Sequence, residues 1–108
     1  MKILLTGASG FLGKTILNAF DNSTEIITLG RSKDAIVNCD LSNQIPILPI
    51  VEMVIHAAGK AHLVPKNDEE RMDFDRVNVQ GTRNLLIALE NNVSLKKIVF
   101  ISSVSVYG

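Results

Sequence analysis

Short apolar runs alternate with amphipathic stretches along the chain, and this alternation predicts strands separated by helices. Apolar runs rich in β-branched residues predict five strands, at about residues 2–6, 25–29, 35–37, 53–57 and 97–102. Apolar residues at three- and four-residue spacing predict helices over about residues 11–20 and 69–91. Strands that alternate with helices are typical of a parallel sheet with helices on its faces.

The longer predicted helix would bury one apolar stripe and end in a polar cap. The stripe consists of Phe74, Val77, Gly81, Leu85 and Leu89. Asn91-Asn92 would end the helix, because asparagine tolerates the left-handed conformation of a C-terminal cap.

The second and third predicted strands depart from this regular scheme. Only residues 30–34 separate them, which is too few for the usual helical crossover between parallel strands. Pro46 and Pro49 stand between the third and fourth strands, where a crossover helix is expected. We therefore expect that side of the sheet to be shortened and irregular.

Length and charge exclude several classes of protein. The 108 residues fit one domain, residues 1–108, and the eleven basic and eleven acidic residues cancel. Bulk charge therefore gives no attraction to nucleic acid or to a membrane surface. No apolar run is long enough to span a bilayer, and the chain opens on a strand rather than a signal peptide, so we expect a cytoplasmic protein. Cys39 is the only cysteine, and we expect a small, buried or half-buried side chain rather than a reactive thiol.

The first turn from strand to helix carries a glycine pattern suited to phosphate. It reads Thr6-Gly7-Ala8-Ser9-Gly10-Phe11-Leu12-Gly13. Gly7 would allow a sharp turn, Gly10 a close approach of backbone to phosphate, and Gly13 tight packing of the helix. The N–H groups at the start of the helix would face the anion. Residues 7–13 are therefore predicted to bind the pyrophosphate of a dinucleotide.

Three further motifs follow in order along the chain. They are His56-Ala57-Ala58-Gly59, Asn78-Val79-Gln80-Gly81-Thr82 and Ser102-Ser103-Val104-Ser105-Val106-Tyr107-Gly108. Together with the glycine loop, they make the whole chain resemble the N-terminal half of an extended short-chain dehydrogenase/reductase. The resemblance is to the NAD-dependent epimerase/dehydratase group, which acts on nucleotide sugars.

This resemblance implies both a fold and a function. The fold would be α/β, a Rossmann-like doubly wound sheet of about five parallel strands in the order 3-2-1-4-5, with three αβα layers. The function would be that of the cofactor-binding half of a nucleotide-sugar epimerase, dehydratase or reductase. Such enzymes move a hydride between a sugar carbon and the nicotinamide.

The resemblance also gives roles to the residues that end the fourth strand. Ala57-Ala58-Gly59 would lie beside a ribose, because small residues let the backbone pass close to it. His56 is expected to be a packed, hydrogen-bonded strand residue rather than a catalyst.

The last two motifs carry roles near the reacting groups. Asn78 would support the cofactor and the active-site backbone, Ser102 would lie at the cofactor, and Ser103 would bind the reacting hydroxyl. A serine alone cannot act as the base. The family supplies that base from a Tyr-x-x-x-Lys helix, and no lysine lies four residues after Tyr107. We therefore expect these 108 residues to lack the catalytic pair and the substrate domain, and to be inactive alone.

The end of the second strand bears on the choice of cofactor. It reads Leu29-Gly30-Arg31-Ser32, without the acid that usually holds the ribose 2′-OH of NAD. Arg31 can pair with a 2′-phosphate and Ser32 can donate a hydrogen bond to it, which favours NADP over NAD. Alternatively, Arg31 stacks on the adenine of either cofactor.

Asp40-Leu41 follows the third strand, where the family places an acid against the adenine amino group. Asp40 would accept a hydrogen bond from adenine, and Leu41 would supply an apolar wall. Equally, Asp40 would cap the turn that follows it.

Two other functions are weighed against this one. Gly13-Lys14-Thr15 is similar to the end of an NTPase phosphate-binding loop, but Ala8 stands where that motif requires glycine. A non-enzymatic sensor that binds a dinucleotide is the alternative function, although such a sensor has no chemical need for Ser103.

The fifth predicted strand has no later strand within these residues to cover its edge. Its apolar run, Ile98-Val99-Phe100-Ile101, would leave an exposed edge, so we expect self-association there.

Overall fold

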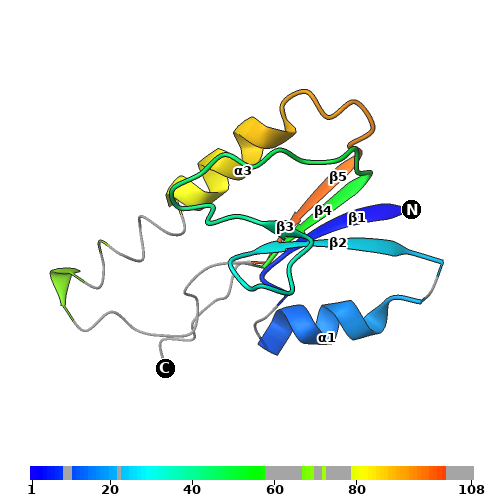
Figure 1. Ribbon diagram of the computed structural model, residues 1–108, viewed down its shortest axis with the longest axis horizontal. Helices are drawn as coiled ribbons and strands as arrows, with labels where there is room; N and C mark the ends of the chain where they lie inside the picture. Colours follow the sequence, from blue (N-terminus) through cyan, green and yellow to red (C-terminus); the bar gives the residue numbers. More distant parts are fainter. Residues whose placement is uncertain (9–10, 22, 58–66, 70–71, 73–78, 102–108) are drawn as a thin grey trace.

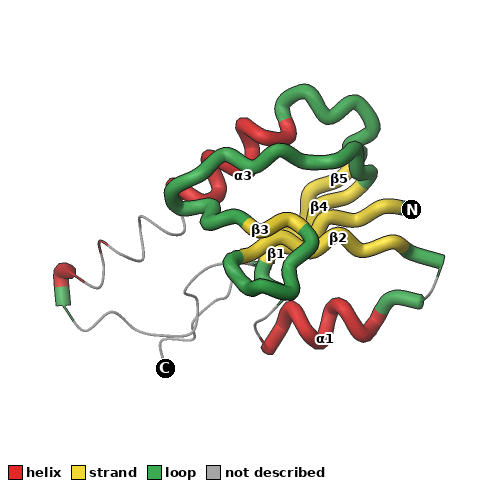
Figure 2. The backbone as a smooth tube through the Cα atoms, in the orientation of Figure 1, coloured by secondary structure: helices red, strands yellow, loops and turns green. Residues whose placement is uncertain are grey.

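In the part of the chain that the structure describes, five parallel strands form one sheet in the order β3-β2-β1-β4-β5 (Figures 1 and 2). The computed structural model describes residues 1–8, 11–21, 23–57, 67–69, 72 and 79–101, and of residues 11 and 12 the backbone alone. The strands are β1 (Lys2–Thr6), β2 (Glu25–Gly30), β3 (Val37–Asn38), β4 (Met53–His56) and β5 (Lys97–Phe100). The predicted strand order is confirmed.

Helices cover both faces of this sheet (Figure 1). The helix α1 (Phe11–Ala19) lies over one face, and α3 (Gly81–Leu89) lies over the other together with the irregular segment 39–51. The three layers expected from the alternation of strands and helices are therefore present.

Side chains of β1 alternate between two cores, which explains why the strand is apolar throughout. Leu4 belongs to the core beneath α3, whereas Ile3 and Leu5 belong to the core beside α1. The α3-side core contains Leu4, Ile27, Leu29, Cys39, Leu41, Val51, Val54, Leu85 and Leu89. The α1-side core contains Ile3, Leu5 and Ile55, with Ala8, Ile16, Phe20, Ile26, Met53 and Ile101 packed against it.

The third strand is shorter and begins later than predicted. It spans Val37–Asn38, which pair with Leu29 and Gly30 of β2, instead of residues 35–37. The loop before it folds back on β2, and the N–H of Ile36 donates to Thr28 Oγ1 at 3.0 Å. That bond takes Ile36 out of the strand. The connection contains no helix, as its length predicted.

Residues 39–52 contain turns but no helix, as the two prolines predicted. This segment is held by the loop that follows α3. Asn92 Nδ2 donates to Pro49 O at 2.9 Å, and Asn92 Oδ1 accepts from the N–H of Val51 at 3.2 Å. Val51 is fully buried.

The described part of the longer predicted helix is α3, and its predicted stripe is buried at Gly81, Leu85 and Leu89. Phe74 and Val77 lie outside the described residues. The predicted left-handed cap is wrong, since Glu90 caps the helix with φ −54° and no described non-glycine residue has a positive φ. The amide of Asn92 is used instead for the contacts with Pro49 and Val51. None of the helices in the described residues is long and apolar enough to cross a membrane.

Candidate functional site

The carboxyl ends of the strands bring several of the predicted site residues to one edge of the sheet. Gly7 follows β1, Arg31 follows β2, Asp40 follows β3 and Ala57 follows β4. In an open parallel sheet, this edge is where ligands bind.

The turn between β1 and α1 depends on two glycines. Gly7 has a φ of 81°, a left-handed conformation that side chains rarely adopt. A Cβ added at Gly13 would lie 1.8 Å from Gly7 O and 2.7 Å from Ala8 Cα. The first turn of α1 therefore lies directly on the backbone of the turn before it. Gly13 therefore permits contact with this turn, while tight packing of the helix on the sheet at Gly13 stays a prediction.

The ends of β1 and β4 are joined by a buried histidine. Thr6 pairs in register with His56, and Thr6 Oγ1 lies 2.6 Å from His56 Nδ1. His56 Nε2 lies 3.2 Å from Thr82 Oγ1 in the first turn of α3. The ring is packed edge-on against Phe100, with 5.9 Å between ring centroids. Burial lowers the pKa of His56, so the ring is neutral near neutral pH. The prediction of a packed, hydrogen-bonded residue is confirmed.

Asp40 caps the turn that follows β3. Its Oδ1 accepts from the N–H of Ser42 at 3.1 Å and from Ser42 Oγ at 2.7 Å, and its Oδ2 accepts from Asn43 Nδ2 at 3.0 Å. The bond from the Ser42 hydroxyl is the main cause of the lowered pKa of Asp40, and the charge of Arg31 lowers the pKa further. The capping interpretation is confirmed, while contact of Asp40 with adenine stays a prediction.

Leu41 packs in the core beneath α3 and is 8% exposed, so little of it is left to form a wall for adenine. Its carbonyl accepts a hydrogen bond from Asn84 Nδ2 at 2.6 Å, and Asn84 Oδ1 accepts from Gln80 Nε2 at 3.1 Å. A buried amide of α3 thus holds the chain directly after Asp40.

Arg31 and Ser32 lie in the exposed loop after β2. Ser32 Oγ accepts from the N–H of Asp34 at 3.2 Å and keeps its own proton to donate. Asn38 Nδ2 donates to the carbonyl of Ser32 at 2.9 Å, which fixes the loop against β3. The charge of Arg31 acts on Asp40, so the two side chains lie close enough at this edge to interact.

Seven predicted site residues lie outside the described residues: Ser9, Gly10, Ala58, Gly59, Asn78, Ser102 and Ser103. For Phe11 and Leu12 the structure describes the backbone alone. Their predicted roles stay predictions.

Sequence reasoning missed two polar residues that shape this edge, Thr6 and Asn84. Both are buried, at 0% and 5% exposure. The signal for Asn84 was its place in α3 directly before the buried Leu85, where an amide needs a partner. Thr6 gave no separate signal, because threonine is an ordinary residue in a strand.

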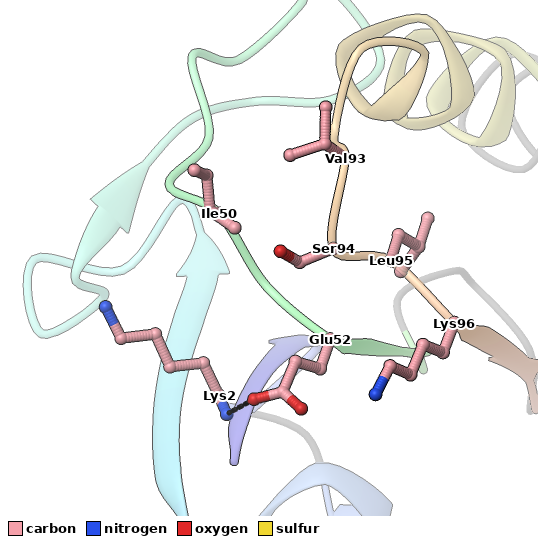
Figure 3. Close-up of a pocket in the computed structure, with 7 residues that line it drawn as sticks. All are labelled: Lys2, Ile50, Glu52, Val93, Ser94, Leu95 and Lys96. Carbon is pink, nitrogen blue, oxygen red and sulfur yellow. Dashed lines mark hydrogen bonds between the residues drawn. The ribbon is translucent and has the colours of Figure 1, made fainter.

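A cavity of about 420 Å³ lies at the opposite, amino edge of the sheet (Figure 3). It is lined by Lys2, Ile50, Glu52, Val93, Ser94, Leu95 and Lys96. Two of its charged side chains have partners. Glu52 Oε1 accepts from the backbone N–H of Lys2 at 3.3 Å, and Lys2 Nζ lies 3.7 Å from Glu25 Oε2. The length of β1 separates Lys2 in this cavity from the Gly7 turn by roughly 16 Å, at about 3.3 Å per strand residue.

Comparison with known proteins gives a consistent family match. The NAD dependent epimerase/dehydratase family matches residues 3–108. A curated relative, GDP-6-deoxy-D-talose 4-dehydrogenase of Aggregatibacter actinomycetemcomitans, is 31% identical over 100% of this chain and 37% of its own length. The chain thus spans little more than a third of that relative and corresponds to the N-terminal portion of such proteins.

Solved structures share the fold. UDP-N-acetylglucosamine 4-epimerase from Methanobrevibacter ruminantium, in complex with UDP-N-acetylmuramic acid, matches with a TM-score of 0.78 and 27% identity, over 99% of this chain and 39% of its own. UDP-glucuronic acid 4-epimerase from Bacillus cereus, in complex with UDP-glucuronic acid and NAD, matches with a TM-score of 0.77 and 24% identity, over 100% of this chain and 42% of its own.

Proposed function

The chain belongs to the NAD-dependent epimerase/dehydratase family, and from this we propose that its carboxyl edge binds a nicotinamide dinucleotide. It would serve as the cofactor-binding part of an enzyme that acts on a nucleotide sugar. The observation that carries the proposal is the close contact of Gly13 with the left-handed turn at Gly7. Any Cβ at residue 13 would clash with the backbone of that turn. This contact places the first turn of α1 against the loop, where its N–H groups can bind a pyrophosphate.

We expect different residues of this edge to bind different parts of the dinucleotide. Residues 7–13 would hold the pyrophosphate, and Arg31, Ser32, Asp40 and Leu41 would lie at the adenosine end. Residues 57–59 would lie along a ribose. Asn78 would support the site, while Ser102 and Ser103 would lie at the nicotinamide end, with the Ser103 hydroxyl bound to the reacting sugar hydroxyl.

The cofactor itself supplies the redox chemistry, because a nicotinamide ring accepts or returns a hydride. The residues of this chain bind and orient it. We assign no base within the 108 residues, and we expect them to be inactive on their own. Epimerisation or reduction of a UDP- or dTDP-sugar by these residues alone would contradict this part of the proposal. A cytoplasmic location belongs to the same proposal.

Arg31 bears on which dinucleotide is preferred. The Bacillus cereus epimerase was solved with NAD, whereas an exposed arginine after β2 with Ser32 beside it is suited to the 2′-phosphate of NADP. We propose that the site accepts both dinucleotides and that Arg31 gives NADP the higher affinity.

Calorimetric titration of the 108-residue chain with NAD and with NADP tests both statements. We expect binding of both, and an Arg31→Ala variant should lose at least about tenfold in NADP affinity with a smaller loss for NAD. Lys33→Ala, which removes an exposed cation from the same loop, is the matched control and should leave both affinities unchanged. Equal losses for NAD and NADP in Arg31→Ala would refute the phosphate contact. A folded chain that binds neither dinucleotide would refute the proposed function.

The exposed edge of β5 supports the further proposal of self-association. In the described residues β5 pairs with β4 alone, and Val99 and Phe100 are 36% and 50% exposed. A second copy of this chain could pair with that edge. Light scattering over a range of concentrations should show a mass that rises with concentration, and a monomer throughout would contradict the proposal.

A further inference from the structure

Three segments at the carboxyl edge, two of them in the proposed dinucleotide site, meet on one buried side chain, His56. Thr6, bonded to one ring nitrogen, directly precedes the Gly7 turn. The N–H of Ala57, directly after β4, donates to the same Thr6 Oγ1 at 3.1 Å. Thr82, bonded to the other ring nitrogen, lies in the first turn of α3. The imidazole therefore joins the turn after β1, the chain after β4 and the start of α3.

The geometry of the ring excludes a direct catalytic role. His56 is 8% exposed, and both of its nitrogens are within hydrogen-bond distance of threonine hydroxyls. One nitrogen of the neutral ring carries the proton, and the other accepts a proton from a threonine, since each hydroxyl can do either. No nitrogen is left to face a substrate.

The described groups that contact the ring are uncharged. They are Thr6 from β1, Phe100 from β5 and Thr82 from α3. A protonated ring would therefore be buried without a described counter-ion, and it could no longer accept a hydrogen bond. Protonation is expected to loosen the junction.

We propose that His56 is a positioning residue of the dinucleotide site, which holds the Gly7 turn, the residues after β4 and the first turn of α3 at the spacing that binding requires. This inference rests on the proposed function and adds one expectation to it. Affinity for the dinucleotide should fall as the ring becomes protonated, although the ring does not touch the ligand.

The test is titration with NAD at about pH 8 and about pH 5, and the lower value is set well below the ordinary histidine pKa of about 6.5 because burial lowers the pKa of His56. NAD is the suitable probe because its pyrophosphate charge is constant over this range, whereas the 2′-phosphate of NADP titrates within it. The unmodified chain should bind more weakly at the lower pH. His56→Gln keeps a donor and an acceptor but cannot be protonated, so its affinity should be the same at both pH values.

Two further variants complete the experiment. His62→Gln removes the other histidine of the chain and should keep the pH dependence of the unmodified protein. Thr82→Val removes one of the two bonds to the ring in a residue of equal size, and should weaken NAD binding roughly fivefold at the higher pH.

The outcomes separate this inference from the proposed function. The inference would be overturned if His56→Gln lost NAD affinity at the lower pH as much as the unmodified chain does. It would also be overturned if Thr82→Val bound NAD as tightly as the unmodified chain. In either case the proposal of NAD binding would stand. A folded chain that binds no NAD at either pH would overturn the proposed function instead. Hydrogen exchange without ligand then decides the positioning role: in Thr82→Val, exchange should become faster at Gly7 and Ala8, and unchanged exchange there would overturn it.

Discussion

The two edges of the sheet, at the carboxyl and the amino ends of its strands, differ in how far their polar side chains are buried. At the carboxyl edge, Thr6, His56 and Asn84 are at most 8% exposed, and each is hydrogen-bonded. At the amino edge, the side chains of Lys2 and Glu25 are 54% and 61% exposed, and their charged atoms are 3.7 Å apart. Figure 3 shows the residues that line the cavity at this second edge, among them the charged Lys2, Glu52 and Lys96.

The difference teaches where sequence changes should matter. A buried polar group has exchanged its water for one fixed partner, so removal of that partner leaves it unsatisfied. An exposed ion pair keeps its water and gains little from its partner. We therefore expect substitutions at the carboxyl edge to lower the free energy of unfolding strongly, and substitutions at the amino edge to lower it little.

The largest effect is expected at Gly13. A methyl group there would lie 1.8 Å from Gly7 O and 2.6 Å from Gly7 C. Because both are backbone atoms, Gly13→Ala must move α1 away from the turn, at a cost of at least about 3 kcal/mol in the free energy of unfolding. Urea denaturation followed by circular dichroism measures this cost, and NAD binding should be lost with it.

The matched control for Gly13 is Gly30→Ala at the end of β2. A Cβ at Gly30 would meet no atom within 4 Å, so the free energy of unfolding should change by less than about 1 kcal/mol. Similar losses in the two variants would show that the contact between Gly13 and Gly7 is not the cause.

The second effect is expected at Asn84, which bonds the carbonyl of Leu41 at 2.6 Å. Asn84→Ala would leave that buried carbonyl without its donor and should cost about 2 kcal/mol. Arg83→Ala, on the exposed neighbouring position of α3, should change the stability by less than about 0.5 kcal/mol. If Asn84→Ala were as mild as Arg83→Ala in the same denaturation experiment, water would be an adequate partner for the carbonyl, and this edge would be no more sensitive than the other.

Local patterns in the sequence predicted much of the fold. The parallel sheet followed from the alternation of elements, and the turn at Gly7 from the spacing of glycines within eight residues. Local patterns display both of these features directly, whereas the strand order was implied by the family resemblance.

The parts that could not be predicted depend on contacts between distant residues. His56 meets Thr6 fifty residues away and Thr82 twenty-six residues away, and Asn84 meets Leu41 at a separation of forty-three. Polar residue types alone do not show which partner each will find. The third strand was misplaced for a different reason: the N–H of Ile36 bonds the side chain of Thr28, eight residues earlier, and the apolar character of residues 35–37 does not show this bond.

The third effect concerns Asn92, which lies towards the amino edge and is the counterpart of Asn84. It bonds the carbonyl of Pro49 and the N–H of Val51 in the segment that leads into β4. Since these bonds are partly exposed, Asn92→Ala should cost about 1 kcal/mol. Five residues of α3, about 7.5 Å, separate Asn84 from Leu89, and Asn92 lies beyond them in the loop that follows the helix, so the double variant should lose the sum of the two costs within about 0.5 kcal/mol. A larger coupling energy in the double-mutant cycle would show that the two edges are not independent.

The smallest effect is expected at the amino edge itself, for Lys2→Ala. The ion pair between Lys2 Nζ and Glu25 Oε2 is exposed on both sides, so its loss should change the free energy of unfolding by less than about 0.5 kcal/mol. Even this change should disappear at about 1 M salt, where the screening length falls to roughly 3 Å. The backbone N–H of Lys2, which donates to Glu52, is unaffected by the substitution. Denaturation at low and high salt measures the effect, and a cost above about 1 kcal/mol that persists at high salt would mean that the lysine acts through the packing of its aliphatic stem in the cavity. In that case substitutions would destabilise the protein at the amino edge as much as at the carboxyl edge, and exposure would not decide which edge is sensitive.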